Sequence, residues 1–249
     1  MSRLPIWITT GLSTIWAASA LAQSPVLSPF QGAPGSAGTS ALQAPWQVLG
    51  LPGGKVPLTQ IDVVPTDSGA AVRIQAQRSY GSAIHGLPAV PVRMASVLRW
   101  RWKLDTQLVG ADLRRKDGDD TALKVCLMFD MPLDRVPFVE RQLLRIARAK
   151  TGQELPAATV CYVWDPTLAR ESGLPNAWSP RVRYLVVDGA DSPLRQWRTV
   201  QRSIQADFLR LFGDETDEVP PLSGVAIGAD ADNTGGHSLA WVANIQLLP

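Results

Sequence analysis

The sequence predicts an all-β protein, an antiparallel two-sheet sandwich of jelly-roll-like type with two helical excursions. Three observations support this class. Several segments alternate apolar and polar residues with the period of a strand, and turn-forming clusters of Gly, Asp, Pro and Ser separate them. Two segments have the spacing of a helix instead. The segments also lack the regular strand–helix alternation of a parallel α/β sheet.

The predicted strands fall into two kinds. Strict alternation marks residues 72–76, 98–104 and 239–247. Because successive side chains of a strand point to opposite faces, each of these segments places its apolar set on one face. Other runs are apolar at nearly every position and predict central strands covered on both sides, at 123–129 and 182–187. Shorter apolar runs complete the set at 160–164 and 225–229.

Two segments are expected to be helices. Residues 138–150 carry an apolar side with arginines on the opposite side: Val139, Leu143, Ile146 and Ala147 against Arg141, Arg145 and Arg148. In residues 200–212 the core-facing set is Ile204, Phe208, Leu211 and Phe212. Gly213 follows as a typical helix stop.

Residues 1–22 are expected to be a secretory signal peptide. A positive charge near the start is followed by an apolar run, which ends in a small–x–small cleavage pattern at Ala20 to Ala22. A membrane anchor is the alternative. However, the run is shorter than the ~20 residues that cross a bilayer and contains Pro5 and Gly11. The prediction is a periplasmic or secreted protein with no membrane span after signal cleavage.

The rest of the chain is expected to form a flexible linker, residues 23–44, and a single β-sandwich domain, residues 45–249. The linker is mostly Gly, Pro, Ser and Ala and holds no charged residue. Such a segment buries too little apolar surface to offset its ordering entropy. The remaining residues suffice for one domain with a substantial core.

Composition excludes several classes of protein. With 45% hydrophobic and 18% charged residues the chain is not intrinsically disordered, and a net charge of +2 gives no general drive towards nucleic acid. Two cysteines make neither a disulfide-dense scaffold nor a four-thiolate zinc site. Cys126 and Cys161 either form one disulfide in an oxidising compartment or stay two buried thiols, and the sequence leaves both open.

Acidic residues gather in two loops beside predicted strands. Asp119 and Asp120 precede one central strand, and Asp230, Asp232 and Asn233 follow another. Calcium takes about six to eight oxygen ligands, so these five residues are its candidate ligands, although neither loop fits the EF-hand template. Ordinary turn chemistry is the alternative, because Asp and Asn favour turns.

A basic row is predicted on the strand 98–104, on the face opposite its tryptophans. The row comprises Arg99, Arg101 and Lys103, with Lys124 and Arg183 as extensions on neighbouring strands. An open face of this kind could hold an anionic or hydroxyl-rich ligand, because guanidinium groups supply paired donors. Arg101 and Lys124 are therefore candidate ligand-binding residues. The alternative is a solvated sheet face.

The tryptophans divide into loop and core sets. Exposed indole rings can stack on sugars, and the rings in or near loops are Trp46, Trp178 and Trp197, of which the last two are ligand-binding candidates. The rings on apolar strand faces are expected in the core, namely Trp100, Trp102, Trp164 and Trp241.

Arg202 is a further ligand-binding candidate. Its separation of five residues from Asp207 is not the i, i+4 spacing of a helical ion pair, so the two are expected to have different partners. Pairing of Arg202 with Asp230 or Asp232, which would lock the last loop, is the structural alternative to ligand binding.

Enzyme templates are largely missing. The sequence holds no Gly-x-Ser-x-Gly elbow, no Walker loop and no His-Glu-x-x-His. His85 and His237 lie near glycines and are expected to be exposed rather than catalytic. A hydrolase with paired carboxylates is the enzymatic alternative, using Asp120 with Asp230 or Asp232.

The motifs together resemble a known family. Trp-Arg-Trp-Lys at 100–103, Asp-Gly-Asp-Asp at 117–120, Cys-Tyr-Val-Trp at 161–164, Arg202 with Asp207-Phe, and Asp-Ala-Asp-Asn-Thr-Gly at 230–235 follow in the order of the bacterial exported family called domain of unknown function 3047. The resemblance covers residues 46–249 and implies a β-sandwich of carbohydrate-binding type, with no established activity. Lys124 departs from the family, where arginine often follows the double Asp.

The sequence favours a non-catalytic exported module that binds a saccharide or other polar ligand. The alternatives are a glycan-active hydrolase and an envelope protein-interaction module that uses the basic helix 138–150 as its contact surface. No nucleic-acid partner is expected, no cofactor other than calcium is suggested, and the oligomeric state stays open.

Overall fold

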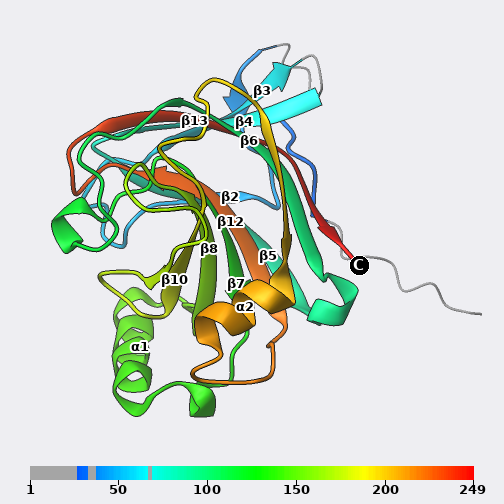
Figure 1. Ribbon diagram of the computed structural model, residues 1–249, viewed down its shortest axis with the longest axis vertical. Coiled ribbons are helices and arrows are strands. Elements are labelled where there is room, and N and C mark those ends of the chain that lie inside the picture. The colour runs from blue at the N-terminus through cyan, green and yellow to red at the C-terminus, as the bar shows by residue number, and fades with distance from the viewer. Residues whose placement is uncertain (1–26, 33–37, 67–68) are drawn as a thin grey trace, which may run out of the picture.

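The computed structural model describes residues 27–32, 38–66 and 69–249, so the predicted signal peptide lies outside the described residues. Two sheets pack face to face, as the alternation predicts (Figure 1). The six-stranded sheet runs in the order β1 (Ser40–Ala41), β3 (Gln60–Thr66), β4 (Gly69–Gln77), β13 (His237–Leu248), β6 (Val97–Thr106) and β11 (Arg198–Ser203).

The seven-stranded sheet carries the strands that lead into the acidic loops. Its order is β2 (Gln47–Leu49), β5 (Tyr80–Val90), β12 (Leu222–Asp230), β7 (Lys124–Phe129), β8 (Ala158–Trp164), β10 (Val182–Asp188) and β9 (Gly173–Pro175). The ladders of both sheets are antiparallel except β8 with β10, which is parallel. The predicted sandwich is confirmed with that one local difference.

The core lies between the sheets and is rich in aromatic rings. Trp100 and Trp102 of β6 are fully buried, with ring centroids 5.4 Å apart in an edge-to-face arrangement. Tyr162 and Trp164 meet them from β8, at 5.2 and 5.8 Å. Edge-to-face and offset pairs of this kind add to the gain from apolar burial. These three tryptophans are where the sequence predicts them.

Trp241 is an exception, and the prediction of a core position is wrong. A bulge shifts the register of β13 against β6 between Ala243 and Gln246. One inserted residue moves the side chains before it to the other face of the sheet. Trp241 therefore pairs with Lys103 on the outer face and donates its indole N–H to Asp105 over 2.7 Å.

Helix α2 (Ile204–Phe212) buries the predicted apolar side, including Phe208 and Phe212. It begins later than predicted because residue 200 belongs to β11 and pairs with Trp100. Ser203 caps the helix by accepting the backbone N–H of Ala206.

Helix α1 (Phe138–Thr151) is present as predicted, and most of its apolar side faces outward. Leu144 faces inward, whereas Val139, Leu143 and Ile146 are exposed. The polar side holds the helix to the domain: Glu140 pairs with buried Arg181, as described below. Single turns of 3-10 helix occur at Val92–Met94, Lys116–Gly118 and Leu133–Arg135. No helix in the described ranges is both long and apolar enough to span a bilayer.

The predicted linker is partly ordered in the described residues. Leu27 and Phe30 are buried, and Phe30 packs against Trp46 at 5.2 Å. The indole N–H of Trp46 donates to the carbonyl of Ser28 over 2.9 Å. His85 is buried in the same place, where its Nε2 accepts the backbone N–H of Ser28, so the prediction of an exposed His85 is wrong. His237 is exposed as predicted.

Cys126 and Cys161 form a disulfide. They are register partners on the neighbouring antiparallel strands β7 and β8. The bond lies on the outer face of the seven-stranded sheet, within a second, smaller apolar cluster that includes Leu113, Val163 and Tyr184. Of the two alternatives that the sequence leaves open, a disulfide or two buried thiols, the structure contains the disulfide.

Candidate functional site

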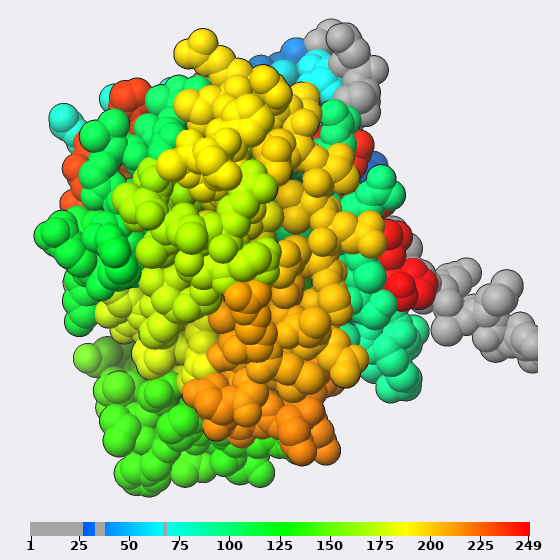
Figure 2. Space-filling model, viewed as in Figure 1, coloured from blue at the N-terminus to red at the C-terminus, as the bar shows by residue number. Residues whose placement is uncertain are grey.

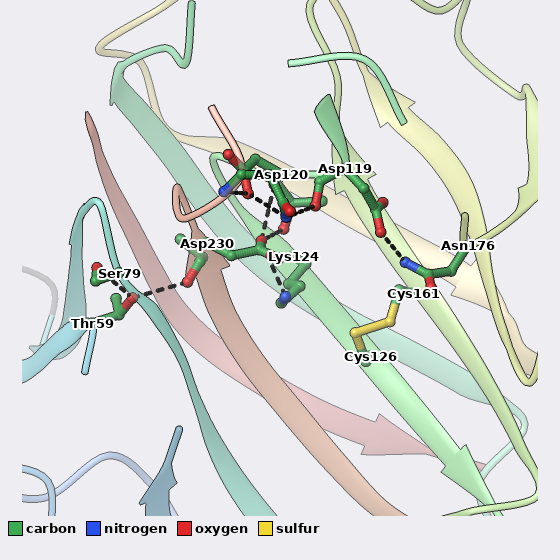
Figure 3. Close-up of polar contacts among 12 residues, drawn as sticks. Thr59, Ser79, Asp119, Asp120, Lys124, Cys126, Cys161, Asn176 and Asp230 are labelled. Carbon is green, nitrogen blue, oxygen red and sulfur yellow. Dashed lines mark hydrogen bonds and ion pairs between the residues drawn. A yellow bond between two sulfur atoms is a disulfide. The ribbon is translucent and has the colours of Figure 1, made fainter. Parts of the chain in front are cut away.

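The two acidic loops meet at one end of the seven-stranded sheet. Asp119 and Asp120 lie in the loop that leads into β7, and Asp230 ends the neighbouring strand β12. Figure 3 shows these residues at the same end of the two strands, next to Lys124. We call Asp119, Asp120, Asp230 and Asp232 the Asp cluster.

A buried ion pair lies at the centre of the Asp cluster. The Lys124 ammonium is 3.1 Å from Oδ1 of Asp230, and both side chains are buried. Burial by itself would lower the pKa of Lys124, but the charge and hydrogen bond of Asp230, together with the charges of Tyr80 and Asp119, outweigh it and raise the pKa above its ordinary value. Thr121 donates its backbone N–H to the same oxygen over 2.9 Å, and its hydroxyl donates there too. The Lys124 ammonium also lies 4.8 Å from the ring centre of Tyr80.

Asp120 joins the two loops. It accepts the backbone N–H and side-chain amide of Asn233, each at 3.2 Å, and the backbone N–H and hydroxyl of Thr234 at 2.7 and 2.6 Å. Both oxygens of this buried carboxylate are therefore occupied by donors. The side-chain amide of Asn233 also donates to the backbone carbonyl of Asp119.

Asp119 turns away from the other carboxylates. Its oxygens accept the side-chain amide of Asn176 at 2.5 Å and the hydroxyl of Tyr184 at 3.1 Å. Burial raises the pKa of Asp119 to about 6, and the charge of Asp230 adds to this, while the two hydrogen bonds oppose it. Asp119 is thus a carboxyl group whose charge changes near neutral pH.

Three members of the predicted calcium set converge. Asp120, Asp230 and Asp232 each offer an oxygen, and these oxygens lie within 4.8 Å of one another. Burial, with the charges of Asp230 and Asp120, raises the pKa of Asp232. One oxygen of Asp232 is buried without a hydrogen bond. Asp119 does not join this group, and calcium binding stays a prediction.

Trp178 lies beside the Asp cluster on the loop that follows β9. It is the most exposed tryptophan of the described residues, at 62%. Asn176 fixes the loop, since its side-chain oxygen accepts the backbone N–H groups of Trp178 and Ser179 at 2.9 and 2.8 Å. The Lys116 ammonium lies 4.8 Å from the Trp178 ring centre. Through Asn176, the exposed ring is tied to buried Asp119.

The other predicted ligand residues lie elsewhere. Arg101 and Trp197 are in contact, with the guanidinium carbon 5.1 Å from the ring centre, but on the outer face of the six-stranded sheet. Lys103 continues this row between the rings of Trp197 and Trp241, at 5.7 and 4.8 Å. Lys124 belongs to the other sheet. The predicted ligand set is therefore divided between two sites.

Arg202 pairs with other residues than those predicted. It donates to both oxygens of Asp207, at 2.8 and 2.7 Å, and to both oxygens of Glu171, at 2.8 and 3.1 Å. The prediction of a pair with Asp230 or Asp232 is wrong. The chain turns from β11 directly into α2 after Ser203. Because of this turn, Asp207 lies next to Arg202 although the two are five residues apart in the sequence.

Arg183 does not extend the basic row. It donates to Asp214 over 2.6 Å and to Glu215, and its guanidinium carbon lies 4.2 Å from the ring centre of Phe212. Sequence reasoning also missed three residues that complete the site, Lys116, Asn176 and Tyr184. Asn176 carries a usable signal, because an asparagine two residues before Trp178 is typical of a side-chain-closed turn. The positions of Lys116 and Tyr184 depend on contacts between distant segments.

The fold and this loop-assembled polar site define a β-sandwich protein in which the exposed Trp178 ring accompanies a cluster of carboxylates. The model of a protein family of unknown function, DUF3047, matches residues 44–246, and the chain belongs to that family. Among curated protein sequences, none matches this chain.

Solved structures that are similar to this chain include a carbohydrate-binding module and an endoglucanase. The family 11 carbohydrate-binding module of the cellulosomal cellulase Lic26A-Cel5E of Clostridium thermocellum is 11% identical, with 82% of this chain and 86% of that chain covered and a TM-score of 0.39. The endoglucanase cel12A from Rhodothermus marinus is also 11% identical, with 82% and 95% covered and a TM-score of 0.40.

Proposed function

We propose that this exported protein is a non-catalytic module that binds a saccharide through Trp178 and the polar groups around it. The exposed Trp178 ring, held beside the Asp cluster, is the observation that carries the proposal. An indole ring offers a flat apolar surface of the kind that packs against the C–H face of a sugar. In this proposal the signal peptide at residues 1–22 directs export.

The surroundings of Trp178 support a polar ligand. Asn176, Asp119 and Tyr184 form one hydrogen-bonded chain that leads from the ring to the interior. Lys116 brings a charged donor to the ring itself. Because the Asn176 turn already fixes the loop, little conformational entropy is lost when a ligand stacks on Trp178.

The alternative of a glycan-active hydrolase has weaker support. A catalytic pair must reach a substrate, one carboxyl as acid and the other as base or nucleophile. Asp120 is 1% exposed and Asp230 is 4% exposed. Their oxygens already accept hydrogen bonds from Asn233, Thr234 and Thr121. These contacts favour a role in holding the loops together.

A glycan-array screen followed by titration of the best ligand tests the proposal. We expect Trp178→Ala to weaken binding about tenfold or more, since loss of a central aromatic contact costs at least ~1.4 kcal/mol. Trp197→Ala is the matched control, because that ring lies on the other sheet and should leave affinity unchanged. The melting temperature of each variant checks folding.

Two results would overturn the proposal. One is an array on which the folded wild-type chain binds no glycan. The other is a Trp178→Ala variant that binds as tightly as wild type while Trp197→Ala loses affinity, which would move the site to the six-stranded sheet.

A further inference from the structure

Helix α1 presents an apolar face to solvent. Of the seven large apolar side chains more than half exposed in the described residues, four belong to α1: Phe138 at 67%, Val139 at 67%, Leu143 at 60% and Ile146 at 52%. The last three recur at i, i+4 and i+7 and so form one stripe along the helix. Figure 2 shows this segment, in green, at the lower corner of the molecule.

The opposite side of α1 is firmly attached to the domain. Leu144 is buried, and Glu140 lies 2.5 Å from the guanidinium of buried Arg181. Arg148 donates twice to the carbonyl of Leu155, at 2.9 and 2.6 Å. These contacts fix the rotation of the helix, so the apolar stripe points outward in the folded protein.

Positive charge borders the apolar stripe. Lys150 lies four residues after Ile146, next to the stripe, and Arg145 lies seven residues after Phe138, on the same side of the helix as that ring; both are exposed. Arg141 lies with its guanidinium carbon 5.7 Å from the Phe138 ring centre. The one acidic residue of α1, Glu140, is engaged inward with Arg181. The outward side of the helix therefore combines apolar and cationic groups without a carboxylate from α1.

We propose that α1 docks the protein on the surface of an anionic phospholipid bilayer. A helix in the membrane interface places apolar side chains below the headgroups and Lys or Arg at headgroup level. The stripe and its cationic borders match that order of layers. The proposal uses the exposed side of α1 and does not depend on ligand binding at Trp178, whose loop leads into β10 at the same end of β7 as α1.

Other occupants fit the charges less well. A second copy of this chain would bring the Arg145 and Lys150 borders of two helices together, and like charges at close range repel. The exposed side of α1 is also a single convex helix, with Gln142 as the one uncharged amide to orient a partner by hydrogen bonds. A lipid surface needs no such orienting contact.

Vesicle flotation with the purified chain tests the proposal. The vesicles are pure phosphatidylcholine or equal parts phosphatidylglycerol and phosphatidylcholine. We expect binding to the anionic vesicles, and a loss of about tenfold or more in the partition coefficient for the double variant Leu143→Gln with Ile146→Gln. Arg145→Gln with Lys150→Gln should lose about tenfold on anionic vesicles and nothing on neutral ones.

A matched control alters exposed apolar residues elsewhere. Leu58 and Val109 are 53% and 88% exposed and lie outside α1. The variant Leu58→Gln with Val109→Gln should bind vesicles as wild type does. Trp178→Ala should do the same, so that failure of the saccharide site and failure of this proposal give different results.

Three outcomes would overturn the proposal. The wild-type chain fails to float with anionic vesicles, or the Leu143→Gln/Ile146→Gln variant binds them as well as the control. The third is self-association in sedimentation without lipid that this variant abolishes, which would assign the face to a second copy of the chain.

Discussion

Both ends of the seven-stranded sheet bury paired charges, and the α1 end also exposes four large apolar side chains. Strand β7 joins them, since Asp119 and Asp120 precede Lys124 and α1 follows Phe129. At the Asp cluster, charged side chains are buried and paired. At α1, large apolar side chains are exposed. Partners, rather than residue type, decide which side chains are buried at each end.

The physical reason is the same at both ends. A buried charge is tolerated where an opposite charge and hydrogen-bond donors replace its water. Lys124 and Thr121 do this for Asp230. At α1, the pair of Glu140 with Arg181 requires the polar side of the helix to face the domain. The apolar side then has no protein surface left to cover it among the described residues.

The largest expected effect is at the buried ion pair. Lys124→Met leaves Asp230 charged and unpaired, and we expect it to lower the free energy of unfolding by about 3–5 kcal/mol. Urea denaturation measures this. The control is Lys124→Met with Asp230→Asn, which removes both charges and should recover much of the loss. A single variant as stable as wild type would mean that the pair does not stabilise this end.

Two adjacent leucines sharpen the contrast at the other end. Leu144 is buried and Leu143 is exposed. We expect Leu144→Ala to cost about 2–3 kcal/mol, because it leaves a cavity, and Leu143→Ala to change stability by less than about 0.5 kcal/mol. Thermal and urea unfolding compare them. Equal losses would show that α1 is rotated relative to the arrangement described above.

Asp119 should make stability depend on pH. Its pKa is about 6 in the folded chain against 3.8 ordinarily, so between these values the folded state holds a proton that the unfolded state has released. The free energy of unfolding therefore falls as pH rises from about 4 to about 6. We expect Asp119→Asn to be more stable than wild type by about 2 kcal/mol at pH 7, and equally stable near pH 4. A difference that does not change with pH would contradict this.

The smallest expected effect concerns calcium at the Asp cluster. Asp120 and Asp230 already accept protein donors, and Lys124 neutralises one charge. We therefore expect a chelator to shift the melting temperature by less than about 1 °C, since only a ligand that binds the native state stabilises it. A melting temperature that rises with added calcium, and does not rise in Asp232→Asn, would establish the metal site instead.

Sequence patterns predicted the fold better than the site. Alternation identified β6 and the apolar runs identified β7. Burial of one face of a strand produces alternating apolar and polar residues, and burial of both faces produces a continuous apolar run. Strand β5 was missed, since Gly81, Gly86 and Pro88 interrupt its pattern. The two acidic loops were identified, but the separation of Asp119 from Asp120 was not predictable. Adjacent residues face different partners there, Asn176 and Thr234.

The sequence by itself determined the family, the two-sheet class and most strands of the core, because these depend on local periodicity and motif order. Tertiary structure decided the outward side of α1, the outer position of Trp241 and the pairing of Arg202 with Asp207. Each depends on a contact or a register set by a distant segment: Arg181 for α1, β6 for β13, and the β11–α2 corner for Arg202. The helical spacing of apolar residues shows that one side of α1 is apolar. Only the contacts of its polar side with the domain show that the apolar side faces outward.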